Sequence, residues 1–82
     1  MKIEIECAGF ESEKQRKEFA AEAKKAKIKW TLNEYKYYDI MILEGDEKNL
    51  KKFVEDHWQM TTYHQTYDEL VSNGDIEVTV LD

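Results

Sequence analysis

The apolar residues of this chain are spaced as in a strand in some segments and as in a helix in others, and the order of these segments limits the possible folds. An alternation of apolar and polar residues, typical of a strand with one buried face, occupies residues 2–7, 28–32, 37–43 and 76–81. Apolar residues three or four positions apart, typical of an amphipathic helix, occupy residues 13–26 and 46–58. The resulting order, β-α-β-β-α-β, predicts one small α+β domain over residues 1–82, of the ferredoxin-like (split β-α-β) type.

The segment before the last strand is ambiguous. Its apolar residues follow helical spacing and are Met60, Tyr63, Tyr67, Leu70 and Val71. The Asn73-Gly74 pair that follows is typical both of a helix C-terminus and of a two-residue β-hairpin. Asp68 and Glu69 disfavour a strand, so the sequence favours an extra short helix over a hairpin at about 61–73.

The alternation also indicates which side chains of the strands face the core. Cys7 continues the apolar face of the first strand, which predicts an inert core thiol. In the third strand, Asp39 marks its own face as the more exposed one, so Tyr38 and Ile40 are assigned to the core together with Trp30 of the preceding strand. The neighbouring hairpin tyrosines, Tyr35 and Tyr37, are expected to be exposed, either as cross-strand pairs or as anchors for a partner.

The charges are distributed unevenly along the chain. The formal net charge is −6, and no lysine or arginine follows Lys52. The carboxylates beyond that point are Glu55, Asp56, Asp68, Glu69, Asp75, Glu77 and Asp82. A region of one sign favours encounter with a basic partner, although a solvated face that keeps the protein soluble is the simpler interpretation.

Aromatic residues lie between these carboxylates, and aromatic residues often dominate protein–protein contacts. The residues predicted to bind a partner are Glu55, Asp56, Trp58, Tyr63, Tyr67, Asp68, Glu69, Asp75 and Glu77. The partner expected from this charge is a protein with a basic, nucleic-acid-binding surface.

Other kinds of site find little support in the sequence. His57 and His64 match no zinc-ligand spacing, and no catalytic motif or phosphate-binding glycine loop occurs, so no metal, cofactor or enzymatic activity is expected. Direct nucleic-acid binding is not expected either, because the polar face of the first strand carries Glu4 and Glu6 and no aromatic residue.

The chain has no apolar run long enough for a membrane span and no recognisable signal peptide, and its single cysteine suits a reducing compartment, so we expect a cytoplasmic protein. In its small size, acidic charge and lack of catalytic motifs it is similar to phage-encoded inhibitors of bacterial defence, including anti-CRISPR proteins and DNA mimics. That likeness implies an inhibitor that places carboxylates where phosphates would lie. The alternative is a regulatory or assembly module that pairs through an edge strand as a homodimer and binds a protein or a small ligand.

Overall fold

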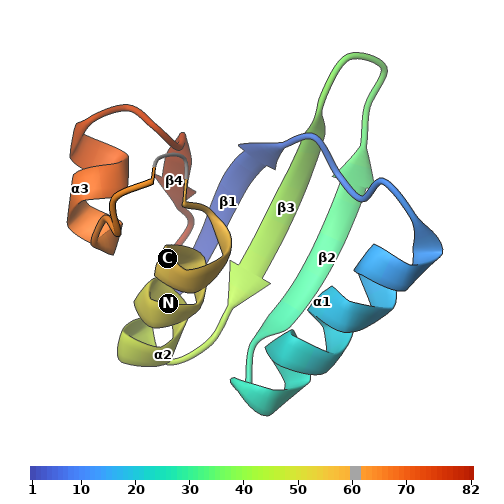
Figure 1. Ribbon diagram of the computed structural model, residues 1–82, viewed down its shortest axis with the longest axis horizontal. Helices are drawn as coiled ribbons and strands as arrows, with labels where there is room; N and C mark the ends of the chain where they lie inside the picture. The colour runs from blue at the N-terminus through green and yellow to red at the C-terminus, as the bar shows by residue number, and fades with distance from the viewer. Residues whose placement is uncertain (60–61) are drawn as a thin grey trace.

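The computed structural model describes residues 1–59 and 62–82 and contains one four-stranded antiparallel sheet in the order β2-β3-β1-β4 (Figure 1). The strands are β1 (Lys2–Cys7), β2 (Lys29–Glu34), β3 (Asp39–Glu44) and β4 (Val78–Val80). The helices are α1 (Glu13–Lys25), α2 (Glu47–His57) and α3 (Tyr67–Ser72). The small α+β class is therefore confirmed, whereas the ferredoxin-like assignment stays a prediction.

The ambiguous segment before the last strand forms the short helix α3. Thr66 begins it with a capping box, in which the Thr66 hydroxyl accepts a hydrogen bond from the Glu69 backbone N–H and the Glu69 carboxylate accepts one from the Thr66 backbone. Gly74 adopts a left-handed conformation just after the helix, with φ of +74°. The helix is thus shorter than the predicted range, and Met60, at the start of the helical spacing, lies outside the described residues.

Helices α1 and α2 cover one face of the sheet, and the core lies between these helices and the strands (Figure 1). α2 contributes the widest apolar stripe, through Leu50, Phe53 and Val54. The buried apolar residues are Ile3, Ile5, Ala23, Ile28, Met41, Leu43, Leu50, Phe53, Val54, Tyr67, Leu70 and Ile76. Within the described residues, none of the helices combines the length and the apolar character that crossing a membrane requires.

The core-facing side of β3 is the opposite of the one predicted. Met41 and Leu43 are buried because the antiparallel register places them beside Ile5 and Ile3 of β1. Asp39 shares their face but lies at the end of the strand, so its carboxylate does not mark that face as exposed. Tyr38, assigned to the core from its alternation with Asp39, is 46% exposed.

Two further predictions about the core can be compared with the structure. Trp30 pairs with Leu43 and packs against the core as predicted. Cys7 is only half-buried, although burial raises the pKa of its thiol, which agrees with an unreactive side chain.

Candidate binding surface

Carboxylates and tyrosines meet at the end of the sheet where β2 turns into β3. They line an open depression of about 800 Å³ that extends from the β2–β3 hairpin to the segment before β4. We call these residues the acidic tyrosine surface: Glu6, Tyr35, Lys36, Tyr37, Tyr38, Asp39, Trp58, Asp75 and Glu77.

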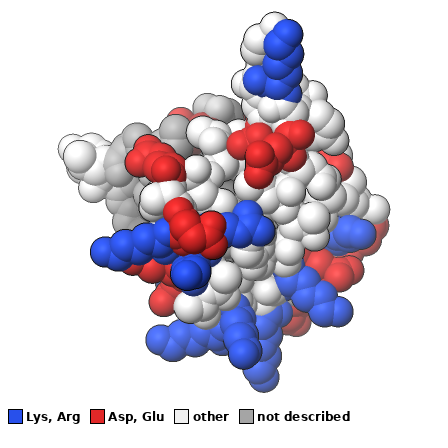
Figure 2. All heavy atoms as spheres, turned by 90° about the vertical axis from the view of Figure 1, so that its right-hand side faces the viewer, with Lys and Arg blue, Asp and Glu red and all other residues white. Residues whose placement is uncertain are grey.

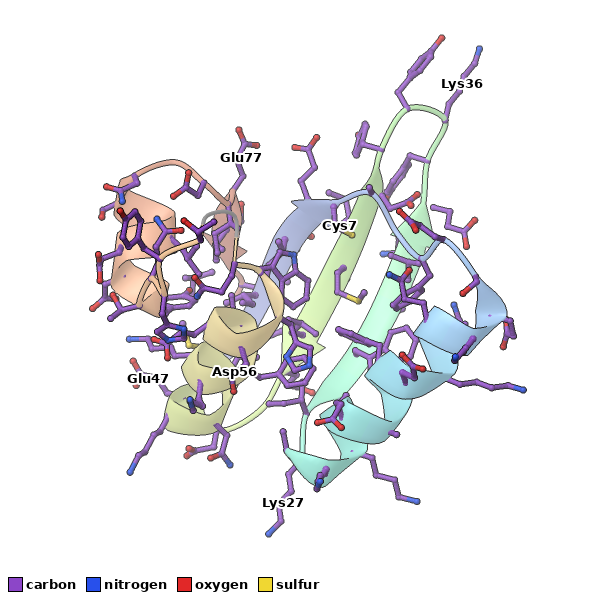
Figure 3. The ribbon with its side chains drawn as sticks, in the orientation of Figure 1. Cys7, Lys27, Lys36, Glu47, Asp56 and Glu77 are labelled. Atoms are coloured by element: carbon purple, nitrogen blue, oxygen red, sulfur yellow. The ribbon has the colours of Figure 1, made fainter. Side chains whose placement is uncertain are left out.

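The β2–β3 hairpin holds its tyrosines in fixed positions. The Tyr35 backbone N–H donates a hydrogen bond to the Tyr38 carbonyl oxygen at 3.0 Å, and the two rings stack with their centroids 5.3 Å apart. Tyr37 lies in the turn between them and is 84% exposed, with the Lys36 Nζ 5.2 Å from the centre of its ring. Figure 3 shows Lys36 at the far tip of this hairpin. The hairpin therefore presents aromatic rings to solvent without burying them in the core.

Two carboxylates from distant parts of the sequence meet beside the hairpin. β4 pairs with β1 so that Ile5 lies opposite Val78, and Glu77, the residue just before β4, contacts Glu6 of β1 through its side chain. A side-chain hydrogen bond with Glu77 raises the pKa of Glu6, and slight burial and the charge of Glu77 raise it further. In Figure 3 the Glu77 side chain points away from the end of the sheet.

The Glu6–Glu77 pair lacks a compensating cation. Among residues 1–59 and 62–82, no lysine or arginine nitrogen lies within 4.0 Å of either carboxylate. Like charges that face each other across neighbouring strands destabilise a sheet. The acidic tyrosine surface therefore carries an excess of negative charge, four carboxylates against the one lysine Lys36, next to exposed aromatic rings.

Several of the carboxylates predicted to bind a partner make contacts within the fold. Glu55 accepts a hydrogen bond from the Tyr67 backbone N–H at 3.2 Å through one oxygen and lies 3.2 Å from His64 Nε2 through the other. Glu69 belongs to the capping box of α3. Asp56 accepts a hydrogen bond from the Lys52 ammonium at 3.1 Å, which is an ordinary i,i+4 pair on α2.

The aromatic residues of the predicted set also differ in their surroundings. Tyr67 is only 9% exposed and belongs to the core, whereas Tyr63 is 82% exposed. Trp58 is half-buried and packs edge-on against Phe19, while one side of it lines the acidic tyrosine surface. Asp68 is exposed on α3.

Of the predicted binding residues, the structure brings together Trp58, Asp75 and Glu77 at the acidic tyrosine surface. Asp75 is held there by a hydrogen bond from the Gln65 side-chain amide at 2.7 Å. Glu6 and Tyr38 were not predicted to lie there, since only the pairing of β1 with β4 and the true face of β3 bring them to this end of the sheet. The one available signal was the cluster of three tyrosines around Lys36.

On the side of the molecule formed by α1 and β2 the charges are mixed (Figure 2). Figure 2 shows the side formed by α1 and β2, where basic and acidic side chains are interspersed. Among the described residues, no group of three or more histidine, cysteine, aspartate or glutamate side chains is arranged to hold a metal ion. No family model, curated protein or solved structure matches this chain.

Proposed function

We propose that this protein is a non-catalytic binding protein that uses the acidic tyrosine surface to occupy a basic, nucleic-acid-binding surface of a partner protein and so inhibits it. The observation that carries the proposal is the Glu6–Glu77 pair, in which two carboxylates lie side by side next to exposed tyrosine rings. Among the described residues, neither carboxylate has a lysine or arginine nitrogen within 4.0 Å. An arginine or lysine of a partner relieves the repulsion between them on binding.

The chemistry of this surface suits a protein that normally binds nucleic acid. Such a partner holds phosphates with arginine and lysine and stacks bases on planar groups. Carboxylates of the acidic tyrosine surface can take the place of phosphates, and the rings of Tyr35, Tyr37 and Tyr38 offer flat faces to guanidinium groups. The proposed mimicry is partial, because the surface contains only four carboxylates.

The net charge of −6 supports the same mechanism at longer range. Electrostatic attraction accelerates the encounter with a basic partner and weakens as salt is added. Inhibitors of this kind, small and acidic and without catalytic groups, are the phage-encoded anti-defence proteins, of which anti-CRISPR proteins are one class. The proposed protein is thus an inhibitor of this phage-encoded kind that acts in the bacterial cytoplasm.

The test compares two double variants that remove the same amount of charge. Glu6→Gln with Glu77→Gln changes the acidic tyrosine surface, whereas Glu44→Gln with Glu47→Gln changes exposed residues at the opposite end of β3 and on α2. A nucleic-acid-binding partner isolated with the wild-type protein is expected to lose about ten-fold in affinity for the first variant, from two weakened ion pairs, and to keep its affinity for the second.

The same partner should release its DNA or RNA when the wild-type protein is added, in a fluorescence-anisotropy competition at low and at moderate salt. Unchanged affinity of the Glu6–Glu77 double variant, or a partner that holds nucleic acid and this protein together, would contradict the proposal.

A homodimeric regulatory module remains the second candidate, because β2 and β4 are both edge strands and Val80 of β4 is 54% exposed. A dimer that persists at high salt in sedimentation experiments, together with an unaffected Glu6–Glu77 double variant, would favour that alternative.

A further inference from the structure

A second cavity lies between α1 and the C-terminal end of α2, on the core side of the sheet. Its volume of about 440 Å³ falls within the range of small-molecule sites. Met41 and Cys7 line its base, and the rings of Phe10, Phe19 and Trp58 form its walls. Figure 3 shows Cys7 at the end of β1. We refer to this cavity as the α1–α2 cleft.

The cleft exists because α1 has few large apolar side chains. Phe19 is its only one, and the residues that continue the apolar stripe are Ala20 and Ala23. α1 packs on β2 while α2 packs on α3, so the two helices meet chiefly where the Phe19 ring approaches Phe53, at a centroid distance of 5.3 Å. Alanine side chains are too small to fill the remaining space between the helices.

Two carboxylates of α1 line the cleft. Glu18 and Glu22 are one helical turn apart, and both are exposed. Within the described part of the chain, neither lies within 4.0 Å of a lysine or arginine nitrogen. Like charges at this spacing destabilise a helix slightly. The cleft is therefore both apolar and negatively charged at one wall.

His57 adds a third hydrogen-bond acceptor. Its Nδ1 lies 2.8 Å from the Phe53 carbonyl oxygen, and because a carbonyl can only accept, Nδ1 carries the hydrogen. In the tautomer with its hydrogen on Nδ1, the ring offers Nε2 as an acceptor. Stacking on Phe53, with the ring centroids 4.2 Å apart, holds the imidazole in this orientation.

We propose that the α1–α2 cleft binds a small organic ammonium ion with an aromatic body. The ammonium group would donate hydrogen bonds to the acceptors, namely Glu18, Glu22 and His57 Nε2. The aromatic body would pack against the wall formed by Phe10, Phe19 and Trp58, which already contact one another with Phe10–Phe19 and Phe19–Trp58 centroid distances of 5.3 and 6.0 Å. Two carboxylates at the wall repel an anionic ligand of the same shape, so charge selects the ligand class.

The test is an NMR titration with three molecules of similar shape and different charge: phenethylamine, phenethyl alcohol and hydrocinnamate. Saturable shifts are expected for Phe19 and Met41, which line the cleft and not the acidic tyrosine surface, with phenethylamine binding about five-fold more tightly than the alcohol and hydrocinnamate the weakest. Glu18→Gln with Glu22→Gln should reduce the affinity for the amine to that for the alcohol. Both positions are exposed, so this variant should fold.

Two controls separate this site from the acidic tyrosine surface. The Glu44→Gln with Glu47→Gln variant and the Glu6→Gln with Glu77→Gln variant should each bind phenethylamine as the wild type does. Loss of partner binding in the Glu6–Glu77 variant therefore leaves the result for the cleft unaffected.

The proposal is overturned by equal affinities for the amine and the alcohol, by shifts confined to residues outside the cleft, or by no saturation at about 10 mM amine. An equally tight complex with N-acetyl-lysine amide, which lacks an aromatic body, would also overturn it and would indicate that the cleft accepts a lysine side chain of a protein.

Discussion

Glu6 is the residue at which stability and the proposed function oppose each other. Its neighbour Glu77 raises the pKa of Glu6 above the ordinary value of 4.5, so the folded protein binds this proton more tightly than the unfolded chain does. Stability therefore falls as the pH rises through the raised pKa, because the deprotonated Glu6 then faces the charge of Glu77. A partner cation that binds there would offset a cost already present in the free protein.

Replacing Glu6 by glutamine should raise the melting temperature at pH 7, because it removes one of the two facing charges. The gain should shrink towards zero below about pH 4, where the carboxyl group of the wild type is protonated as well. Thermal unfolding followed by circular dichroism at several pH values measures this effect. Glu4→Gln is the matched control, since Glu4 lies on the same strand but faces Thr79 of β4. A gain that does not change with pH would contradict the prediction.

At the scale of elements, α3 shows how a predicted binding carboxylate can be required by the fold instead. A helix of six residues is too short to be stable by itself. The Thr66–Glu69 capping box satisfies some of its first backbone N–H groups, and the Glu55 carboxylate on α2 satisfies that of Tyr67. Glu55 thus joins α2 to α3, and only 19% of its side chain is exposed.

Glu55→Ala should lower the free energy of unfolding by about 1–2 kcal/mol, because it leaves the Tyr67 backbone N–H at the start of α3 without its hydrogen-bond acceptor. Asp56→Ala, one position along the same helix, should change it by about 0.5 kcal/mol or less, since it removes only an exposed ion pair with Lys52. Urea denaturation of both variants measures the difference. Equal losses would mean that the contact between Glu55 and α3 contributes nothing to stability.

At the scale of the whole molecule, α3 is part of the single core. Leu70 is fully buried, as are Ile5 of the central strand β1 and Leu50 of α2. The core also includes Tyr67 and Ile76 from the same region, so the segment before β4 closes the core at the edge of the sheet opposite α1. Unfolding of α3 should therefore expose the interior of the entire domain.

Leu70→Ala should cost about 2–5 kcal/mol, a large part of the stability of a small domain. Its neighbour Val71 is 38% exposed, and Val71→Ala should cost about 0.5 kcal/mol or less. Urea unfolding followed by both tryptophan fluorescence and circular dichroism should give one coincident transition in each variant. If Leu70→Ala does not fold, Leu70→Val provides the smaller truncation. A separate early transition for α3, with the sheet intact, would contradict a single core.

Much of the fold could be predicted because it depends on short-range spacing. The alternation of residues 2–7 and the apolar stripe of α2 identify their elements without any knowledge of neighbours, and the preference for a helix over a hairpin before β4 follows from Asp68 and Glu69. The prediction for β3 was wrong because a single aspartate at the end of a strand was used to assign a face, whereas the register with β1 is what buries Met41 and Leu43.

The sequence by itself determined the order of the elements, the excess of carboxylates after Lys52 and the cluster of tyrosines around Lys36. Only the tertiary structure decided which of those carboxylates accept backbone hydrogen bonds and which lie beside another carboxylate. Glu55 and Glu69 meet backbone N–H groups of α3, whereas Glu77 meets Glu6 through the pairing of β4 with β1. The physical reason is that the state of a carboxylate depends on the donors and charges within a few ångströms, and residues far apart in the chain supply these only after folding.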